Sequence, residues 1–220
     1  YAGTGMNSIE LQKAQFEVGS TTSNYQKVVS QYDITESGQE SASFLWFDGF
    51  DDCLVSSVAI DFSNSDEITF SYGLASLATT FTKMSLELGG SFAQLDNSVS
   101  MLTTNGTPSY ALSARGTSTS VATTAASYPA GIISLLSAFA KISTDICVVR
   151  VGGVQVASSA SDQGTGNFRN DFLHIGSRNQ ASNFFSGYIY SGFIINRLLE
   201  PELLFDLEKY WVGDKAGIDL

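Results

Sequence analysis

The stretch FLHIGSRNQASNFFSGYIYSGFIINRLLEPELLFDLEKYWVGDKAGI, residues 172–218, decides the fold that this sequence predicts. It opens with a short apolar strand over 172–175 that Gly176 ends. A polar loop follows over 177–186, and then a strand rich in aromatic and β-branched residues follows over 187–196. The stretch therefore predicts two strands of a β protein joined by a polar loop.

The period of the apolar residues then changes from two to about 3.6, which predicts a terminal amphipathic helix. Glu200-Pro201-Glu202 is typical of a helix start, because proline lacks the N–H that the first turn leaves unpaired and acids suit the positive end of the dipole. Gly213 is predicted to end the helix. At helical spacing, one apolar stripe of this helix is predicted to contain Leu203, Leu204, Leu207, Tyr210 and Trp211.

This order of elements resembles the close of laminin-G-like, concanavalin A-like jelly-roll domains in bacterial and phage surface proteins. In that family a last inner strand precedes a short helix that caps the sandwich. The positions that carry the likeness are Phe185, Gly187, Ile189, Leu207, Glu208, Tyr210, Lys215, Gly217 and Ile218. The resemblance implies an all-β, antiparallel jelly-roll β-sandwich with a short C-terminal helix.

A second likeness lies near the other end of the predicted domain. Asp48-Gly49-Phe50-Asp51-Asp52 resembles the F-D-G-x-D-D signature of laminin-G-like domains, where the first core strand turns back. Together the two likenesses imply a sandwich domain over residues 41–220. Residues 14–28 resemble the last strand and exit of a small β module of phage tail fibre and spike proteins, so 1–40 are expected to be the end of a preceding module plus a connector.

Short strands at close spacing support the same fold class. The clearest hairpin joins 147–151 to 154–157, because Gly152-Gly153 supplies the positive φ angles of a two-residue turn. Residues 132–142 form a long apolar run for which strand and helix both stay open, with the sandwich context favouring strand. Other strands are predicted over 57–62, 68–72, 83–88 and 110–115, and the alternation in 68–72 predicts one buried face.

Composition excludes several classes of protein. The net charge of −11 disfavours nucleic acid as a partner, because the chain repels phosphate backbones. No apolar run reaches the roughly 18 residues that a membrane-spanning helix needs. The two cysteines, Cys53 and Cys147, have apolar surroundings and are interpreted as small buried hydrophobic residues, although a disulfide between neighbouring strands stays open.

The sequence predicts no catalytic site. Concanavalin A-like glucanases carry an E-x-D-x-x-E strand with close carboxylates, and that spacing is missing here. His174 is the only histidine, and its alternation with Leu173 and Ile175 places it on the opposite face of its strand. A surface position on the sheet is the simpler interpretation of this histidine.

Two loops and one strand residue carry the mixture of amides, carboxylates and guanidinium groups that sugar hydroxyls require. The loops, 164–171 and 178–184, flank one short strand and are expected to emerge at its opposite ends. Ordinary polar loops are the alternative interpretation. The candidate ligand-binding residues are Arg115, Asn167, Arg169, Asp171, Arg178, Asn179 and Asn183.

Calcium is the one cofactor that the sequence leaves open, because carboxylate and carbonyl oxygens suit a hard cation. The candidates are scattered without a D-x-D-x-D string, and the alternative is that they are turn residues bonded to their own backbone. They are Asp48, Asp51, Asp52, Asp66, Asp96 and Asp171. We therefore predict no metal ligands among them.

The resemblance implies a non-catalytic carbohydrate-binding domain of a phage virion or tail protein that contacts host surface glycan. Neighbouring virion or tail domains and a homotrimer are its expected assembly partners, and its expected location is the phage tail, extracellular after release. The first alternative is a purely structural or oligomerisation module of a tail fibre. A glycan hydrolase is the second alternative.

Overall fold

The structure is a computed structural model that describes residues 43–77, 82–89, 96–104, 109–218 and 220. The interpretation of residues 1–40 as the end of a preceding module falls outside the described residues and stays a prediction. No helix in the described part is long and apolar enough to cross a lipid bilayer.

The first of two large sheets, named sheet A here, has six antiparallel strands. They lie in the order β1 (Leu45–Asp48), β14 (Ser186–Ile195), β4 (Glu67–Ser76), β9 (Ser134–Lys141), β10 (Ile146–Val151) and β11 (Val154–Ser159). The predicted hairpin is confirmed, because Gly152 and Gly153 have φ of 58° and 75° between β10 and β11. The run 132–142 contains β9, so strand was the correct interpretation, and the one-turn helix η1 (Ile142–Thr144) follows it.

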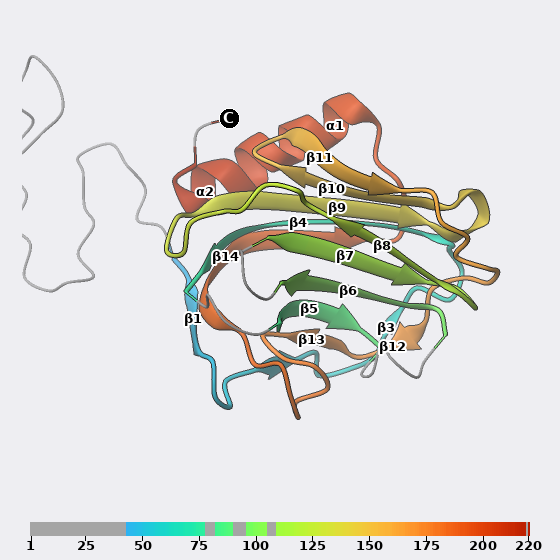
Figure 1. Cartoon of the computed structure of the whole chain (residues 1–220), viewed down its shortest axis with the longest axis horizontal. Helices are drawn as coiled ribbons and strands as arrows, with labels where there is room; N and C mark the ends of the chain where they lie inside the picture. The colour runs from blue at the N-terminus through green and yellow to red at the C-terminus, as the bar shows by residue number, and fades with distance from the viewer. Residues whose placement is uncertain (1–42, 78–81, 90–95, 105–108, 219) are drawn as a thin grey trace, which may run out of the picture. The chain divides into compact units, whose positions relative to one another are not determined.

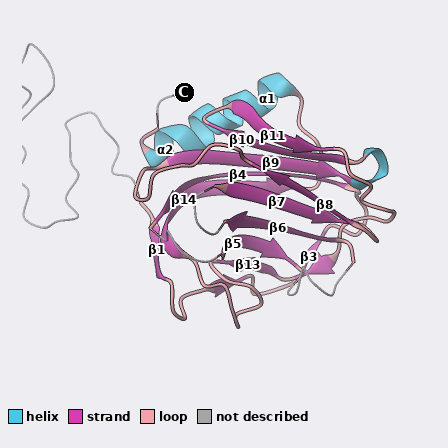
Figure 2. Ribbon diagram, in the orientation of Figure 1, coloured by secondary structure: helices cyan, strands magenta, loops and turns pink. Residues whose placement is uncertain are grey.

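The second large sheet, named sheet B, packs face to face with sheet A (Figure 1, Figure 2). Its antiparallel strands lie in the order β2 (Leu54–Val55), β13 (Leu173–Ile175), β5 (Lys83–Leu88), β6 (Ser98–Thr103), β7 (Tyr110–Arg115) and β8 (Thr119–Thr123). A small ladder of β3 (Ile60–Asp61) and β12 (Asn170–Asp171) lies beside them, so the strand predicted over 57–62 shortens to two residues. The predicted jelly-roll sandwich is therefore confirmed.

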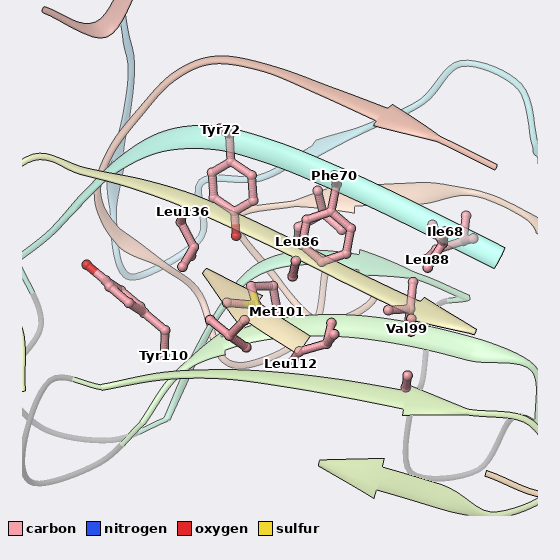
Figure 3. Packing of buried hydrophobic residues seen from close by; sticks show 14 of the residues in the cluster. Ile68, Phe70, Tyr72, Leu86, Leu88, Val99, Met101, Tyr110, Leu112 and Leu136 are labelled. Atoms are coloured by element: carbon pink, nitrogen blue, oxygen red, sulfur yellow. The ribbon is translucent and has the colours of Figure 1, made fainter. Parts of the chain in front are cut away.

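The core lies between the two sheets (Figure 3). Each strand sends every second side chain into it, because successive side chains of a strand point to opposite faces. The large buried side chains that meet there include Ile68, Phe70 and Tyr72 of β4 with Leu86, Leu88, Val99, Met101 and Leu112 of sheet B.

The prediction that β4 buries one face is wrong, because both of its faces are buried. The terminal helix covers the face of sheet A that points away from the core (Figure 1). A Cβ atom at Gly73 would lie 2.8 Å from the Cβ atom of Ala216, so the helix backbone packs closely on the strand there. On the same face Ser137 donates a hydrogen bond of 2.7 Å to the hydroxyl of Ser71, which satisfies two buried polar groups.

The terminal helix starts where the sequence predicts and ends later. It consists of α1 (Pro201–Asp206), the π-helical segment η2 (Leu207–Gly213) and α2 (Asp214–Ala216). Gly213 does not end the helix, because it keeps helical angles of −59° and −59°. Gly217 takes the left-handed conformation, with φ of 69°, and ends it.

The predicted apolar stripe is also wrong, since Tyr210 is 60% exposed and Trp211 is 48% exposed. The buried face follows a spacing of four residues through Leu204, Glu208, Val212 and Ala216. A glutamate occupies this face because the guanidinium of Arg150 on β10 forms a bidentate ion pair with it, at 2.8 and 2.9 Å. The sequence pattern alone places Glu208 on the solvent side of the helix. Its burial could have been predicted only with the knowledge that Arg150 lies opposite it.

The interpretation of both cysteines as buried hydrophobic residues holds for Cys147 and is wrong for Cys53, which is only partly buried. Cys53 and Cys147 are both free thiols, and only Cys147 is buried. Burial raises the pKa of the Cys147 thiol to about 11. The hydrogen bond from Lys141 holds the pKa of the Glu67 carboxyl below its ordinary value, and the Nζ–Oε1 distance is 2.7 Å.

Candidate functional site

A row of polar side chains crosses the face of sheet B that points away from the core. Leu86 and Leu88 point into the core, so Glu87 between them points to the opposite face. The strand register pairs Glu87 with the neighbours on both sides, and the row, called the polar row below, consists of His174, Glu87, Ser100 and Ser113. These residues are between 0% and 4% exposed.

Two groups of the polar row have no hydrogen-bond partner among the described residues. They are Nδ1 of His174 and the hydroxyl oxygen of Ser100. A buried polar group without a partner costs roughly 1–3 kcal/mol. Each of these groups can therefore gain free energy from a ligand that brings a hydrogen bond to this face.

Arg178 lies against the polar row from the loop that follows β13. Its Nε donates to Oε1 of Glu87 at 3.3 Å, while its side chain remains 24% exposed. The loop turns back on itself, because the N–H groups of Arg178 and Ser182 each donate to the carbonyl of the other, at 2.8 and 3.2 Å. Asn179 and Asn183 have positive φ of 49° and 53° in this turn. The turn thus holds the arginine over the sheet.

A second group of candidates meets at the end of sheet B where β5 joins β6. Arg115 binds the carboxylate of Asp96 through Nε and Nη2, at 3.1 and 2.9 Å. Arg169 donates from Nη1 to the backbone carbonyl of Asp96 at 3.1 Å, and its Nε binds Asp171 at 3.0 Å. Asp96 therefore connects two arginines that are 54 positions apart in the chain.

The two groups of candidates reach the same face of the sheet. A Cβ atom at Gly89 would lie 3.2 Å from Cδ of Arg169, so this arginine passes over β5 two residues beyond Glu87. Two residues of a strand span about 7 Å. The expectation that the loops flank opposite ends of β13 is consistent with this placement, because one loop enters the strand and the other leaves it. Their arginines nevertheless meet on one surface.

Asn167 is the candidate that lies apart from this face. Its Nδ2 donates to the carbonyl of Ser63 at 2.8 Å, next to the small β3–β12 ladder. The side chain is exposed, and its hydrogen bond to Ser63 fixes the loop and does not reach the polar row.

The charges of this face are balanced by pairing. Each arginine has a carboxylate partner, and the arginine side chain of each pair is partly exposed. The pairs are Arg115–Asp96, Arg169–Asp171 and Arg178–Glu87, at 2.9, 3.0 and 3.3 Å. Such pairs offer adjacent donors and acceptors without a net charge.

The sequence analysis did not select Glu87, Ser100 or Ser113 as candidates. A signal was present, because Glu87 stands between Leu86 and Leu88 in the sequence, although Ser85 beside the register shift of β5 points to the core instead and bonds Tyr72. This alternation indicates that Glu87 faces away from the core. Which residues lie beside it on the neighbouring strands is known only from the strand register. His174 lies on the face that its alternation predicts, but the interpretation of it as a surface residue is wrong, because it is only 4% exposed.

Among the described residues, one cluster of acidic side chains bears on the open question of calcium. Ligand atoms of Asp48, Asp51 and Asp52 lie within 4.8 Å of one another in the turn after β1. The carboxylate of Asp48 accepts the N–H of Phe50 at 2.8 Å, and that of Asp52 accepts the N–H of Asp48 at 3.1 Å. These bonds match the interpretation of turn residues that bind their own backbone.

Comparison with known proteins identifies the fold. No protein family and no curated protein matches the sequence. Solved structures do match. A heptameric SAP-like pentraxin from Limulus polyphemus has a TM-score of 0.59 at 10% identity, over 74% of this chain and 80% of that one. The chain has a concanavalin A-like jelly-roll fold.

Two further structures have the same arrangement. The CBM40 of the Ruminococcus gnavus IT-sialidase, bound to α2,3-sialyllactose, has a TM-score of 0.53 at 13% identity, over 71% of this chain and 96% of that one. Domains LG4-5 of the mouse laminin α1 chain have a TM-score of 0.52 at 12% identity, over 70% of this chain and 41% of that one. At such low identity the likeness concerns the fold.

Proposed function

We propose that this chain is a non-catalytic carbohydrate-binding domain and that it binds sugar on the face of sheet B that carries the polar row. The observation that supports this function best is the pair of buried, unpartnered groups on that face, Nδ1 of His174 and the hydroxyl of Ser100. Sugar hydroxyls both donate and accept hydrogen bonds, so one ligand suits both groups. The partly exposed guanidinium group of Arg178 is the first contact that a ligand makes.

The charge balance of the face supports a neutral sugar as the ligand. A carboxylated sugar has to compete with Asp96, Asp171 or Glu87 for each arginine, and the chain as a whole carries a net charge of −11. A neutral sugar instead shares the guanidinium donors of Arg169 and Arg178 with their carboxylate partners. The test must also include an acidic sugar, because the structurally similar CBM40 binds sialyllactose.

The biological role that we propose is recognition of host surface glycan by a phage virion or tail protein. Two sequence likenesses support it. Residues 14–28 resemble a tail-fibre module, and residues 172–218 resemble the close of jelly-roll domains in bacterial and phage surface proteins. Neighbouring tail domains and a homotrimer are the proposed assembly partners, and the phage tail is the proposed location.

A glycan array with neutral, sialylated and uronic acid sugars, followed by calorimetry on each hit, tests the proposal. Ser100→Ala removes the unpartnered hydroxyl and adds no atom at this buried position, and we expect binding at least tenfold weaker with equal or higher stability. Arg178→Lys keeps the positive charge beside Glu87 and loses the planar fork, so we also expect weaker binding. Thr144→Val, at an exposed hydroxyl in η1, is the matched control and leaves binding unchanged.

Two outcomes contradict this function. A folded protein that binds no sugar excludes it, and release of reducing ends from any polysaccharide makes the chain a hydrolase. Binding that is unaffected by Ser100→Ala and Arg178→Lys moves the site away from the polar row.

One observation favours the structural alternative. Trp46 is 61% exposed and pairs with Tyr188 on the face of sheet A that points away from the core. Phe44 packs on the same tyrosine with ring centroids 4.9 Å apart. Exposed aromatic groups of this kind are typical of protein interfaces. A stable oligomer in light scattering that Trp46→Ser dissociates, together with an empty glycan array, supports a structural module.

A further inference from the structure

A partly open pocket of about 170 Å³ lies between the two sheets, on the core side of β13. Apolar side chains from both sheets line it, among them Leu86, Leu173, Ile175, Ile189 and Ile194. The polar row lies on the other face of sheet B, so this pocket is separate from the proposed sugar site. Figure 3 shows Tyr72 and Leu86, two of the lining residues, pointing into the space between the sheets.

The pocket follows from the backbone of β14. The register of β14 on β4 shifts between Ile189 and Gly192, and Gly192 then lies opposite Tyr72, in a position that faces the core. A Cβ atom at Gly192 would lie 2.6 Å from Cβ of Tyr72 and 2.9 Å from the carbonyl oxygen of Ser71. No larger residue fits this position without moving β4, so a core-facing position of β14 lacks a side chain.

Two of the hydroxyl groups among the lining residues, those of Tyr72 and Ser85, are arranged as acceptors. Ser85 donates to the carbonyl of Met101 at 3.0 Å. Tyr72 and Ser85 are 2.7 Å apart, and since the proton of Ser85 is already used, Tyr72 is the donor of that bond. Burial raises the pKa of Tyr72 far above its ordinary value, so the phenol stays neutral. Both oxygens keep lone pairs and have no proton left to donate.

We propose that this pocket binds a small apolar molecule of the size of one benzene ring, with at most one hydrogen-bond donor. A dry cavity of about 150 Å³ lined by Leu, Ile and Phe in another protein binds benzene, so a pocket of about 170 Å³ is large enough for one ring. The lining here has the same chemistry. A hydroxyl or N–H on the ligand adds a bond to the acceptor pair, whereas an acceptor on the ligand gains nothing. A charged ligand is excluded, because no charged side chain lines the pocket.

The probes are benzene and phenol, titrated into the full chain without sugar. The readouts are the methyl resonances of the lining leucines and isoleucines and the thermal unfolding midpoint. We expect saturable shifts with a midpoint at or below about 1 mM, which a ligand of six or seven heavy atoms reaches well within the efficiency limit of small ligands. Phenol is expected to bind several-fold more tightly than benzene.

Ile194→Phe fills the pocket, and Ile195→Phe is its matched control. Ile194 pairs with Phe70 on the core side, whereas Ile195 pairs with Thr69 on the opposite face of the same strand. We expect the midpoint to rise at least tenfold in Ile194→Phe and to stay unchanged in Ile195→Phe. If Ile194→Phe does not unfold cooperatively, Leu173→Phe takes its place.

The absence of saturable shifts up to 10 times the expected midpoint overturns the proposal, as does equal binding in the filled and control variants. Equal midpoints for benzene and phenol overturn the role of the hydroxyl pair. The glycan array does not enter this test, so a failure of the proposed function and a failure of the pocket are recorded separately.

Discussion

The ion pair between Arg150 and Glu208 allows a quantitative prediction about the terminal helix. The side chain of Glu208 is fully buried, and that of Arg150 is 19% exposed. Removing one partner of a buried pair costs about 3–5 kcal/mol, because the other charge stays buried without compensation. Since water reaches part of Arg150, we expect Glu208→Gln to lower the free energy of unfolding by about 2–3 kcal/mol.

Urea and thermal unfolding measure this change. For a domain of this size each kcal/mol lowers the unfolding midpoint by about 2–4 °C, so the expected decrease is about 4–12 °C. Asp214→Asn, at an exposed acid on the same helix, is the matched control and is expected to stay within about 0.5 kcal/mol.

A decrease below about 0.5 kcal/mol for Glu208→Gln refutes the view that this pair holds the helix on sheet A. The double variant Arg150→Met with Glu208→Leu replaces both charges by apolar groups of similar volume. Such replacements are often neutral or stabilising, so this variant should recover most of the lost stability. If it is as unstable as Glu208→Gln, the loss comes from packing and not from the uncompensated charge.

Three further predictions concern other parts of the sandwich. Gly176→Ala should lower the free energy of unfolding by more than about 2 kcal/mol, because Gly176 has φ of +83° and an added Cβ would overlap the ring of Phe47; a smaller loss in urea unfolding contradicts this. Cys147, whose pKa burial raises to about 11, should resist iodoacetamide at pH 8 in the folded protein while the half-exposed Cys53 reacts, as mass spectrometry can show. Glu67 has a folded pKa below its ordinary 4.5, so its ion pair stabilises the fold above pH 4.5 and is lost as the pH falls through the folded pKa. Glu67→Gln should therefore destabilise at pH 7 and have little effect at pH 2.

The strands were predictable wherever local pattern alone decides them. The bounds of β5 and β7 agree with 83–88 and 110–115, because alternation and flanking turns act within a few residues. The hairpin of β10 and β11 was predictable for the same reason, since two glycines specify its turn.

The helix face was not predictable, because it depends on a partner far away in the sequence. Periodicity favours Tyr210 and Trp211 as buried, and it places Glu208 on the solvent side. The fold reverses this choice, since Arg150 lies 58 positions earlier and meets the glutamate only when β10 is in place. A buried charge can be recognised only together with its counter-charge.

The candidate site was predictable in part. Residue type selected Arg115, Arg169 and Arg178, and the structure places all three on one face of sheet B. Sequence could not group them, because Arg115 and Arg169 meet through Asp96, and Arg178 reaches the sheet through a turn. The serines of the polar row carry no signal as single residues, and they become informative only through the register.

The composition of the polar row bears on the choice between the proposed binding face and a purely structural module. The register extends the row from Ser113 to Val121 on β8, so the same face accepts an apolar residue at its exposed end. A module selected for stability alone gains from an alanine at position 100, because the buried hydroxyl of Ser100 lacks a partner in the described chain. Binding sites commonly keep such unfavourable groups, since a ligand satisfies them. The proposed binding function therefore accounts for this serine, whereas packing alone does not.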